Sequence, residues 1–442
     1  MSIKTVENIK TKSSSTKNLE NLLTSEFERS KSFLFGNTQL REQAMDSFFR
    51  QGIPSRKNEE YKYINIDSLL KDEFVLNVNK TITREQIESL TFLKNVITIV
   101  IENGIFSGEL LSLNSLPKGL TICSITEASK KHTETFEKYY SKSFDINTDA
   151  FSALNTAMAK DGAFIHIEKN EIIETPIHII HISTTNSPAI THPRNLIIVE
   201  ECAQVKIIES YSTIDSGAKT FNNALTELVV NANAVVDHYE TEDENNWGYL
   251  INSTQVVQKQ NSIFYTHTFT LSGSLVRNNL NIVLDAENIE THLNGLYLTK
   301  GNQVVDNHTL VDHRKPNCNS NELYKGIVDE RSSATFNGKI FVRKDAQKTN
   351  AFQSNKNILL SDDGTINTKP QLEIYADDVK CSHGTSTGKL DEEKVFYLRA
   401  RGLSETSAKK LLMHAFASEV TNTVKIDDLK KYIEAKISER FE

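Results

Sequence analysis

Cys381 and His383 are the residues whose types and spacing most clearly suggest chemistry, and both lie in the segment Tyr375–Gly384. In a β-strand, side chains two positions apart point to the same side, so this thiol and imidazole could reach a common ligand. A thiolate with an imidazole suits zinc, iron or the edge of an iron–sulfur cluster. Two ligands do not complete such a site. The rest would come from another segment, another subunit or the cluster itself.

Two other interpretations of this pair stay open. A buried thiol beside a hydrogen-bonded histidine would be purely structural. Cys381 could also be a nucleophile with His383 as its base, although the sequence marks no orienting third group and no oxyanion hole. The other histidines and cysteines of the β-rich region are scattered, and we expect most of them to be ordinary core, strand or loop residues. They are His166, His178, His181, His192, His267, His292, His308, His313, Cys202 and Cys318.

A second candidate is the run Phe396–Gly402, which mixes aromatic residues with arginines on a short predicted helix. This composition is typical of protein interfaces, but packing against a core would explain the aromatic residues equally well. The residues that would contact a partner are Phe396, Tyr397, Arg399 and Arg401.

The elements that position these residues change in character along the chain. Apolar residues at helical spacing from about Leu19 to Gly52 predict two helices, which end at Gly52–Ser55 because proline lacks the donor that a helix interior needs. A strand candidate at Val96–Ile101 and a helical stretch at Glu127–Tyr140 follow. Residues 1–150 are therefore predicted to form an N-terminal helical or α+β domain.

Residues 151–388 contain many short β-rich runs, and we expect no helix-period segment to interrupt them. Their linkers are rich in Asn rather than in the Gly and Pro of tight hairpins. Asn tolerates the left-handed backbone conformation and hydrogen-bonds to its own main chain. We therefore predict a mainly β fold with stacked parallel coils and Asn corners, although the sequence shows no strict period.

Residues 389–442 return to helical patterns and predict a C-terminal helical domain. Asp391 is a suitable N-cap for a helix with an apolar face of Val395, Phe396 and Leu398, and Gly402 can end it. Ser404 and Asp427 could cap a second and a third helix.

Composition excludes several classes of function. The 442 residues carry a net charge of −8, the wrong sign for a protein that binds nucleic acid backbones. No apolar run is long enough to cross a bilayer, and the polar N-terminus lacks the apolar segment of a secretory signal, so we expect a cytoplasmic protein. The four cysteines are far apart, and neither glycine-rich phosphate-binding motif occurs, so any nucleotide hydrolysis would belong to a partner.

At this point the sequence resembles a known family, the SufB/SufD proteins of iron–sulfur cluster assembly. The resemblance is carried by Lys369–Gly384, Gly388–Asp391 and Phe396–Gly402, and it covers roughly residues 150 to 420. Further matching motifs are Leu154–Ala157, His192–Arg194, Gly295–Leu298, Gln303–Thr309, Tyr324–Gly326, Phe336–Ile340 and Ala346–Ala351. The N-terminal motif Gly52–Ser55 followed by Glu60–Tyr63 is similar to the SufD branch. Thr385–Thr387 departs from the family's more common Ala-Thr-Val.

The resemblance implies a right-handed parallel β-helix, flanked by helical regions, that is a scaffold rather than an enzyme. It implies pairing with a SufB-like paralogue through the β-helix and binding of a SufC-like ATPase by the C-terminal helices. It also implies that Cys381 and His383 help to hold a transient iron–sulfur cluster, or its iron, at the interface with the SufB-like subunit. No permanently bound cofactor is expected in the isolated chain.

Two alternatives remain. A β-helix edge that pairs with a paralogue could also pair with itself, giving a homodimer that stores or delivers iron. A carbohydrate-active β-helix enzyme would need paired carboxylates. Asp377 and Asp378 are adjacent, so in a strand they would point to opposite faces and could not form such a pair.

Overall fold

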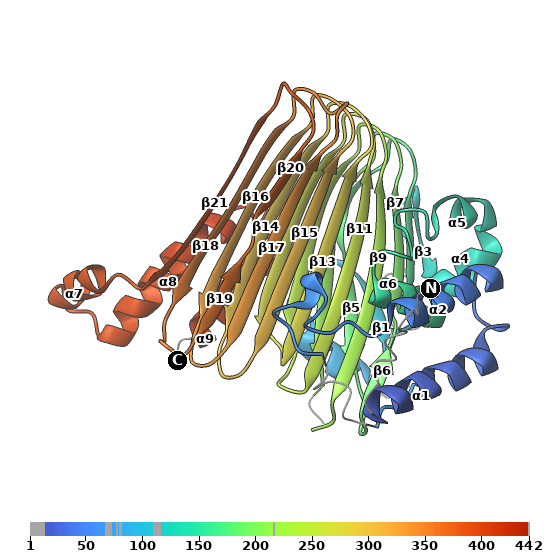
Figure 1. Ribbon diagram of the computed structural model, residues 1–442, viewed down its shortest axis with the longest axis horizontal. Helices are drawn as coiled ribbons and strands as arrows, with labels where there is room; N and C mark the ends of the chain where they lie inside the picture. Colours follow the sequence, from blue (N-terminus) through green and yellow to red (C-terminus); the bar gives the residue numbers. More distant parts are fainter. Residues whose placement is uncertain are drawn as a thin grey trace, which may run out of the picture.

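The structure is a computed structural model, and it describes residues 14–66, 73–76, 78, 82–108, 116–214 and 217–440. Two long sheets face each other across one elongated body, with helices at both ends (Figure 1). From β8 to β19, successive strands alternate between the two sheets, and each strand from β8 to β17 pairs in parallel with the strand two positions along the chain. At the end of the stack, β18 pairs with β21. This is a parallel β-solenoid, which confirms the prediction of stacked coils.

The first sheet has ten strands. In spatial order they are β2 (Ile105–Phe106), β1 (Ile97–Glu102), β5 (Ile172–Ser183), β8 (Gln204–Thr213), β10 (Val235–Asp243), β12 (Ile263–Ser272), β14 (Glu290–Thr299), β16 (Asn319–Val328), β18 (Asn350–Leu359) and β21 (Lys380–Lys389). The second sheet follows the order β19 (Thr365–Thr368), β17 (Ser333–Val342), β15 (Val304–His313), β13 (Leu275–Leu284), β11 (Gly248–Gln258), β9 (Thr220–Val230), β7 (Arg194–Val199), β4 (Ala163–Ile167) and β3 (Leu120–Ser124). In addition, β20 (Gln371–Ile374) pairs with β17, and β6 (Ala189–Thr191) pairs with β9.

The corners of the solenoid carry the predicted left-handed residues. Asn233, Asn261 and Asn288 have φ of 59°, 57° and 58° at successive corners, and each backbone N–H donates to a carbonyl of the next coil. The same column contains Asn170, Cys202, Asn317 and Lys348, so its members lie 27 to 32 residues apart. The Asn-rich linkers are thus explained by a backbone position that few other residues tolerate.

The N-terminal region has α1 (Ser14–Ser30), α2 (Thr38–Gln51), η1 (Glu59–Tyr61), α3 (Arg84–Leu90), α4 (Ile125–Lys131) and α5 (Thr133–Tyr139). The two expected first helices are confirmed, and β1 extends the first sheet as a parallel neighbour of β5. The expectation that no helix interrupts residues 151–388 is wrong, because α6 (Ala150–Met158) opens this region. All nine of its residues are buried, and the polar residues Ser152, Asn155 and Thr156 recur at helical spacing, so the sequence did carry a short helical signal.

The C-terminal helices are α7 (Glu392–Ala400), α8 (Glu405–Thr421) and α9 (Asp427–Arg440). Asp391 and Ser404 cap α7 and α8 as predicted, whereas Asp427 is the first helical residue of α9 rather than its cap. Helices α8 and α9 cover the outer side of the first sheet through one apolar cluster that includes Tyr239, Phe269, Leu296, Met413 and Ile433. Helix α7 projects beyond the solenoid (Figure 1). No helix in the described ranges is long and apolar enough to cross a membrane.

Candidate functional site

The candidate ligands Cys381 and His383 lie on β21, the last strand of the first sheet. In register, they pair with Ala351 and Gln353 of β18, both of which are buried inside the solenoid. Since side chains alternate along a strand, Cys381 and His383 both face the interior side at the end of the coil stack. The prediction that they share one side of a strand is therefore confirmed.

The two side chains differ in environment. Cys381 is partly buried and packs against the apolar cluster of Ile340, Val342, Ala346, Ala351 and Ala376. This burial raises the pKa of its thiol, opposed by a hydrogen bond with the backbone of Ala351. His383 is exposed, because no further strand follows β21 in the sheet. A raised pKa keeps this thiol protonated near neutral pH, so binding of a cation there must release its proton.

A buried polar pair lies in the same register column as His383. Gln353 donates from Nε2 to Oε2 of Glu322 at 2.7 Å, and each side chain is almost fully buried. Oε1 of Glu322 and Oε1 of Gln353 have no hydrogen-bond partner. Burial raises the pKa of Glu322 to about 7, partly offset by the hydrogen bond from Gln353. A protonated Glu322 would donate to the orphaned oxygen of Gln353 and so complete the pair.

The free edge of β21 has exposed apolar side chains in the neighbouring strands and loops. Phe352, Ile374 and Tyr375 are exposed by 45, 40 and 59%. An unpaired strand edge offers a row of backbone donors and acceptors to another chain. This end of the solenoid therefore has the properties of an interface.

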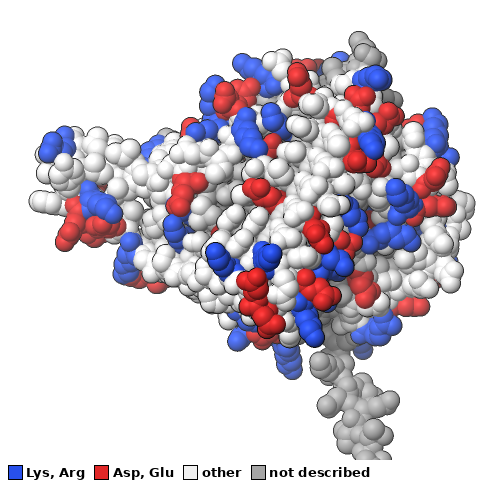
Figure 2. Space-filling model, turned by 90° about the horizontal axis from the view of Figure 1, so that it is seen from above, with Lys and Arg blue, Asp and Glu red and all other residues white. Residues whose placement is uncertain are grey.

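The exposure of side chains on helix α7 tests the two interpretations of the run Phe396–Gly402, which were a protein interface or packing against a core. Phe396 and Tyr397 are exposed by 73 and 58%, whereas Val395 is buried. The predicted apolar face was therefore wrong in including Phe396, and neither aromatic ring belongs to a core. Arg401 lies over the Tyr397 ring at 5.1 Å, and Arg399 pairs with Glu405 at 3.5 Å. Figure 2 shows the protruding end with acidic and basic side chains beside uncharged surface.

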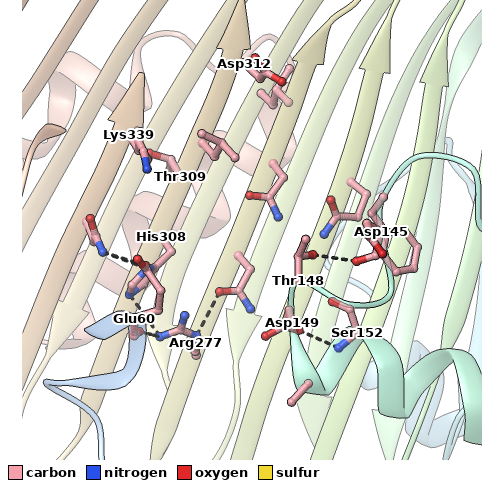
Figure 3. A pocket seen from close by; sticks show the side chains of 18 of the residues that line it. Glu60, Asp145, Thr148, Asp149, Ser152, Arg277, His308, Thr309, Asp312 and Lys339 are labelled. Atoms are coloured by element: carbon pink, nitrogen blue, oxygen red, sulfur yellow. Dashed lines mark hydrogen bonds and ion pairs between the residues drawn. The ribbon is translucent and has the colours of Figure 1, made fainter. Parts of the chain in front are cut away.

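The groove of Figure 3, about 520 Å³ in volume, lies on the outer side of the second sheet. Its cations already have acidic partners: Arg277 with Asp306 at 2.5 Å, Arg314 with Asp312 at 2.8 Å, and Lys339 with Glu373. These pairs leave no free cation among the described basic residues that line it, so we assign it no ligand.

The same groove explains the N-terminal motif at Glu60–Tyr63. The Tyr61 ring lies 3.8 Å from the guanidinium carbon of Arg277, and its hydroxyl donates to Asp149 at 2.9 Å. The backbone carbonyl of Glu60 accepts from Arg277, and its carboxylate lies 3.3 Å from His308. The motif thus fastens the N-terminal segment to the second sheet.

Asp377 and Asp378 are the adjacent carboxylates that were considered for a carbohydrate-active enzyme, on the assumption that they lie in a strand. Asp377 and Asp378 are exposed in the bend between β20 and β21 and not in a strand. The argument that they point to opposite faces was therefore wrong. The backbone of Asp378 stabilises this corner, because its N–H donates to Gln347 Oε1 at 2.9 Å and its carbonyl accepts from the backbone N–H of Lys348.

A group inside the solenoid was missed by sequence reasoning. Glu209 on β8 and His238 and Glu240 on β10 are fully or nearly fully buried, and one ligand atom of each lies within 4.8 Å of the others. The signal was the alternation His238, Glu240, Glu242, which places three polar side chains on one side of β10, with Glu244 just beyond its end. Burial raises the pKa of Glu242 to about 8 and of Glu244 to about 7.

Comparison with known proteins gives two family matches. Residues 181–416 match the model described as SUF system FeS cluster assembly, SufBD core domain, and residues 24–179 match the SufBD protein N-terminal region. The chain is 33% identical over 399 residues to an iron–sulfur cluster assembly SufBD family protein of Synechocystis sp., covering 88% of each chain. It is 29% identical over 402 residues to the iron–sulfur cluster assembly protein SufD of Escherichia coli, covering 90% of this chain and 92% of that protein. It is 26% identical over 336 residues to SufD of Bacillus subtilis, covering 75% of this chain and 76% of that one.

Proposed function

The chain belongs to the SufBD family of the SUF iron–sulfur cluster assembly system, and from this premise we propose that it is a SufD-type scaffold subunit and not an enzyme. In this proposal it pairs with a SufB-like paralogue, and Cys381 and His383 hold the nascent cluster, or its iron, at the shared interface. The observation that carries the proposal is that both residues lie on β21, a free edge of the sheet.

In this proposal, the exposed edge of β21 is the binding position of the SufB-like subunit. A strand of the SufB-like subunit added along the ten residues of β21 would lie beside Cys381 and His383. The partner would then supply the ligands that two residues cannot, and the cluster is cargo held for a time between the subunits. Binding requires the Cys381 thiolate and a neutral imidazole, so it releases a proton from the thiol.

The connection between β21 and α7 supports a mechanical role for an ATPase partner. β21 ends at Lys389, and Asp391 already caps α7. A SufC-like ATPase bound to the exposed aromatic residues of α7 would therefore pull almost directly on the strand with the ligands. Such a movement would open the interface to iron or sulfur.

The first test is co-expression of the tagged chain with the SufB-like and SufC-like proteins of the same organism, followed by affinity capture and mass determination. The double substitution Phe396→Ser/Tyr397→Ser should remove the ATPase and leave the paralogue bound. Phe33→Ser is the matched control, because Phe33 is an exposed aromatic residue outside the C-terminal helices, at 86%. Retention of the ATPase by the double variant would contradict this use of α7.

The second test addresses the ligands in the captured complex. Cys381→Ser and His383→Ala should leave its subunit composition unchanged and lower its iron content several-fold, whereas Cys202→Ser should change neither. In the wild type, iron retention should fall as the pH is lowered from about 8 to about 5.5, because protons compete increasingly with the metal for the thiolate and the imidazole. Iron content that is unaffected by both substitutions would rule out these ligands.

A homodimer through the same edge is the second candidate, because an open strand can pair with its own copy. A captured particle with the mass of two copies, and without the paralogue, would establish it.

A further inference from the structure

The interior of the solenoid brings carboxylates and imidazoles together between β8 and β10. Nε2 of His238 lies 3.0 Å from Oε1 of Glu209, and Nε2 of His181 lies 3.4 Å from its other oxygen. Glu240 pairs in register with Glu209 on the neighbouring strand. Its Oε1 accepts from Thr254 of the opposite sheet at 2.7 Å, which shows that it points into the space between the sheets.

This group contains buried carboxylates with no lysine or arginine side chain beside them among the described residues. Glu209 and Glu240 are exposed by 0 and 3%, and their contacts within the described residues are with His, Asn, Thr and Tyr, with no Lys or Arg. Buried carboxylates normally require a paired cation or a metal ion.

A second observation points to a missing ligand. Glu242 follows on the same side of β10, is fully buried, and accepts from Thr270 at 2.6 Å and Asn278 at 3.0 Å through Oε2 only. Its Oε1 has no hydrogen-bond partner, and neither has Nδ1 of His181. Buried polar atoms without a protein partner, close to a group of ligating side chains, are characteristic of a site that holds an ion or an ordered water.

We propose that Glu209, His238 and Glu240 bind one divalent transition-metal ion inside the solenoid. One imidazole nitrogen and carboxylate oxygens suit Zn²⁺, Fe²⁺, Mn²⁺ or Co²⁺. His181 contacts Glu209 and is stacked on Tyr211 with ring centres 4.4 Å apart, so it orients the carboxylate from outside the ligand set. The ion ties β8 to β10 and thereby joins two neighbouring coils.

This site is separate from the pair on β21. His238 and His383 lie in the same register column, five strand steps apart along the first sheet. At ~4.8 Å per step this is about 24 Å. The proposal does not depend on the proposed function, because it concerns no residue of the β21 edge. Since the ligands are buried, we expect the ion to enter during folding and to exchange slowly.

The test uses Co²⁺ as the probe. The full chain is refolded with Co²⁺, treated with EDTA, desalted, and examined by elemental analysis and visible spectroscopy. The wild type should keep about one equivalent, with d–d bands and without thiolate charge-transfer absorption. The double variant Cys381→Ala/His383→Ala should keep the same amount. His238→Asn and Glu240→Gln should each lose at least 90% of it.

Glu322→Gln is the matched control, because it alters another fully buried carboxylate of the interior and should leave Co²⁺ retention unchanged. A folded wild type that retains less than a tenth of an equivalent would overturn the proposal, whatever the variants do. So would loss of the ion from the Cys381→Ala/His383→Ala variant, or its retention in folded His238→Asn. Should Glu240→Gln fail to fold, Co²⁺ should still raise the melting temperature of the wild type and not that of His238→Asn.

Discussion

At the level of single residues, Glu322 shows how burial of a carboxyl group makes the stability of the fold depend on pH. Its carboxyl stays neutral in the folded protein up to about pH 7, whereas in the unfolded chain it ionises near 4.5. The stability that the neutral form contributes is complete below the lower value and is lost as the pH rises through the higher one. Each pH unit in this window changes the free energy of unfolding by up to about 1.4 kcal/mol.

We therefore expect Glu322→Gln to flatten this dependence. The new amide still accepts from Gln353 and can donate to its orphaned Oε1, so no buried polar atom loses a partner. Between pH 5.5 and 8, the loss of unfolding free energy should be about 2 kcal/mol smaller in the variant than in the wild type. Urea titrations at both values measure it. Glu134→Gln, which alters an exposed carboxylate, should behave as the wild type, and an unchanged slope in Glu322→Gln would refute the prediction.

Only glycine fits at the position of Gly326, because a tyrosine ring of the neighbouring strand fills the space beside it. A Cβ at this position would lie 2.1 Å from the Tyr297 ring, and one at Gly295 would lie 2.2 Å from the Tyr324 ring. The motif glycines of the interior thus make room for tyrosines in adjacent coils. Gly326→Ala should lower the free energy of unfolding by about 1–3 kcal/mol through overpacking. Gly388→Ala should have little effect because nothing lies within 4 Å of its Cβ position. Equal denaturation midpoints for the two variants would contradict this account.

At the level of elements, the left-handed residues at successive corners of the solenoid indicate where a substitution can increase the stability of the fold. Lys348 occupies the left-handed position with φ of 57° and has an exposed side chain. Lys348→Gly should raise the free energy of unfolding by about 1 kcal/mol, because glycine adopts this conformation without a Cβ clash. Lys344→Gly, in the same loop but without a positive φ, should not stabilise the protein. Thermal denaturation of the two variants and the wild type measures these effects. A melting temperature of Lys348→Gly below that of the wild type would contradict the prediction.

The elements also show what a sequence can reveal about this fold. The Asn corners, the caps of α7 and α8 and the common side of Cys381 and His383 follow from rules that act over a few residues, and each was predicted. Helix α6 was missed although Ser152, Asn155 and Thr156 lie at helical spacing, because its nine residues span only about two and a half turns. The interior carboxylates were missed because their partners come from other coils: Glu209 meets His238 across 29 residues. Without a regular period, the sequence alone does not set that register.

At the scale of the whole molecule, the C-terminal helices are part of the fold and not an appendage. Helices α8 and α9 cover Tyr239, Phe269 and Leu296 on the outer side of the first sheet. Deleting residues 392–442 should therefore expose this surface and cause self-association, seen as early elution in gel filtration and increased binding of a hydrophobic dye. The surface variant Phe396→Ser/Tyr397→Ser should remain monodisperse. A soluble, monodisperse deletion variant would show that the sheet does not need this cover.

The attachment of both chain ends across several coils also sets a limit on how such a protein can change in length during evolution. A solenoid grows by duplicating a coil, and each added coil would carry β21 about 4.8 Å further from the N-terminal region. The Glu60–Tyr61 segment, however, contacts β13 and β15, and α8 and α9 contact β12, β14 and β16. A duplication inside this span would pull these contacts out of register. The contacts thus fix the number of coils between the N-terminal segment and β16, and variation in coil number should be rare within this span.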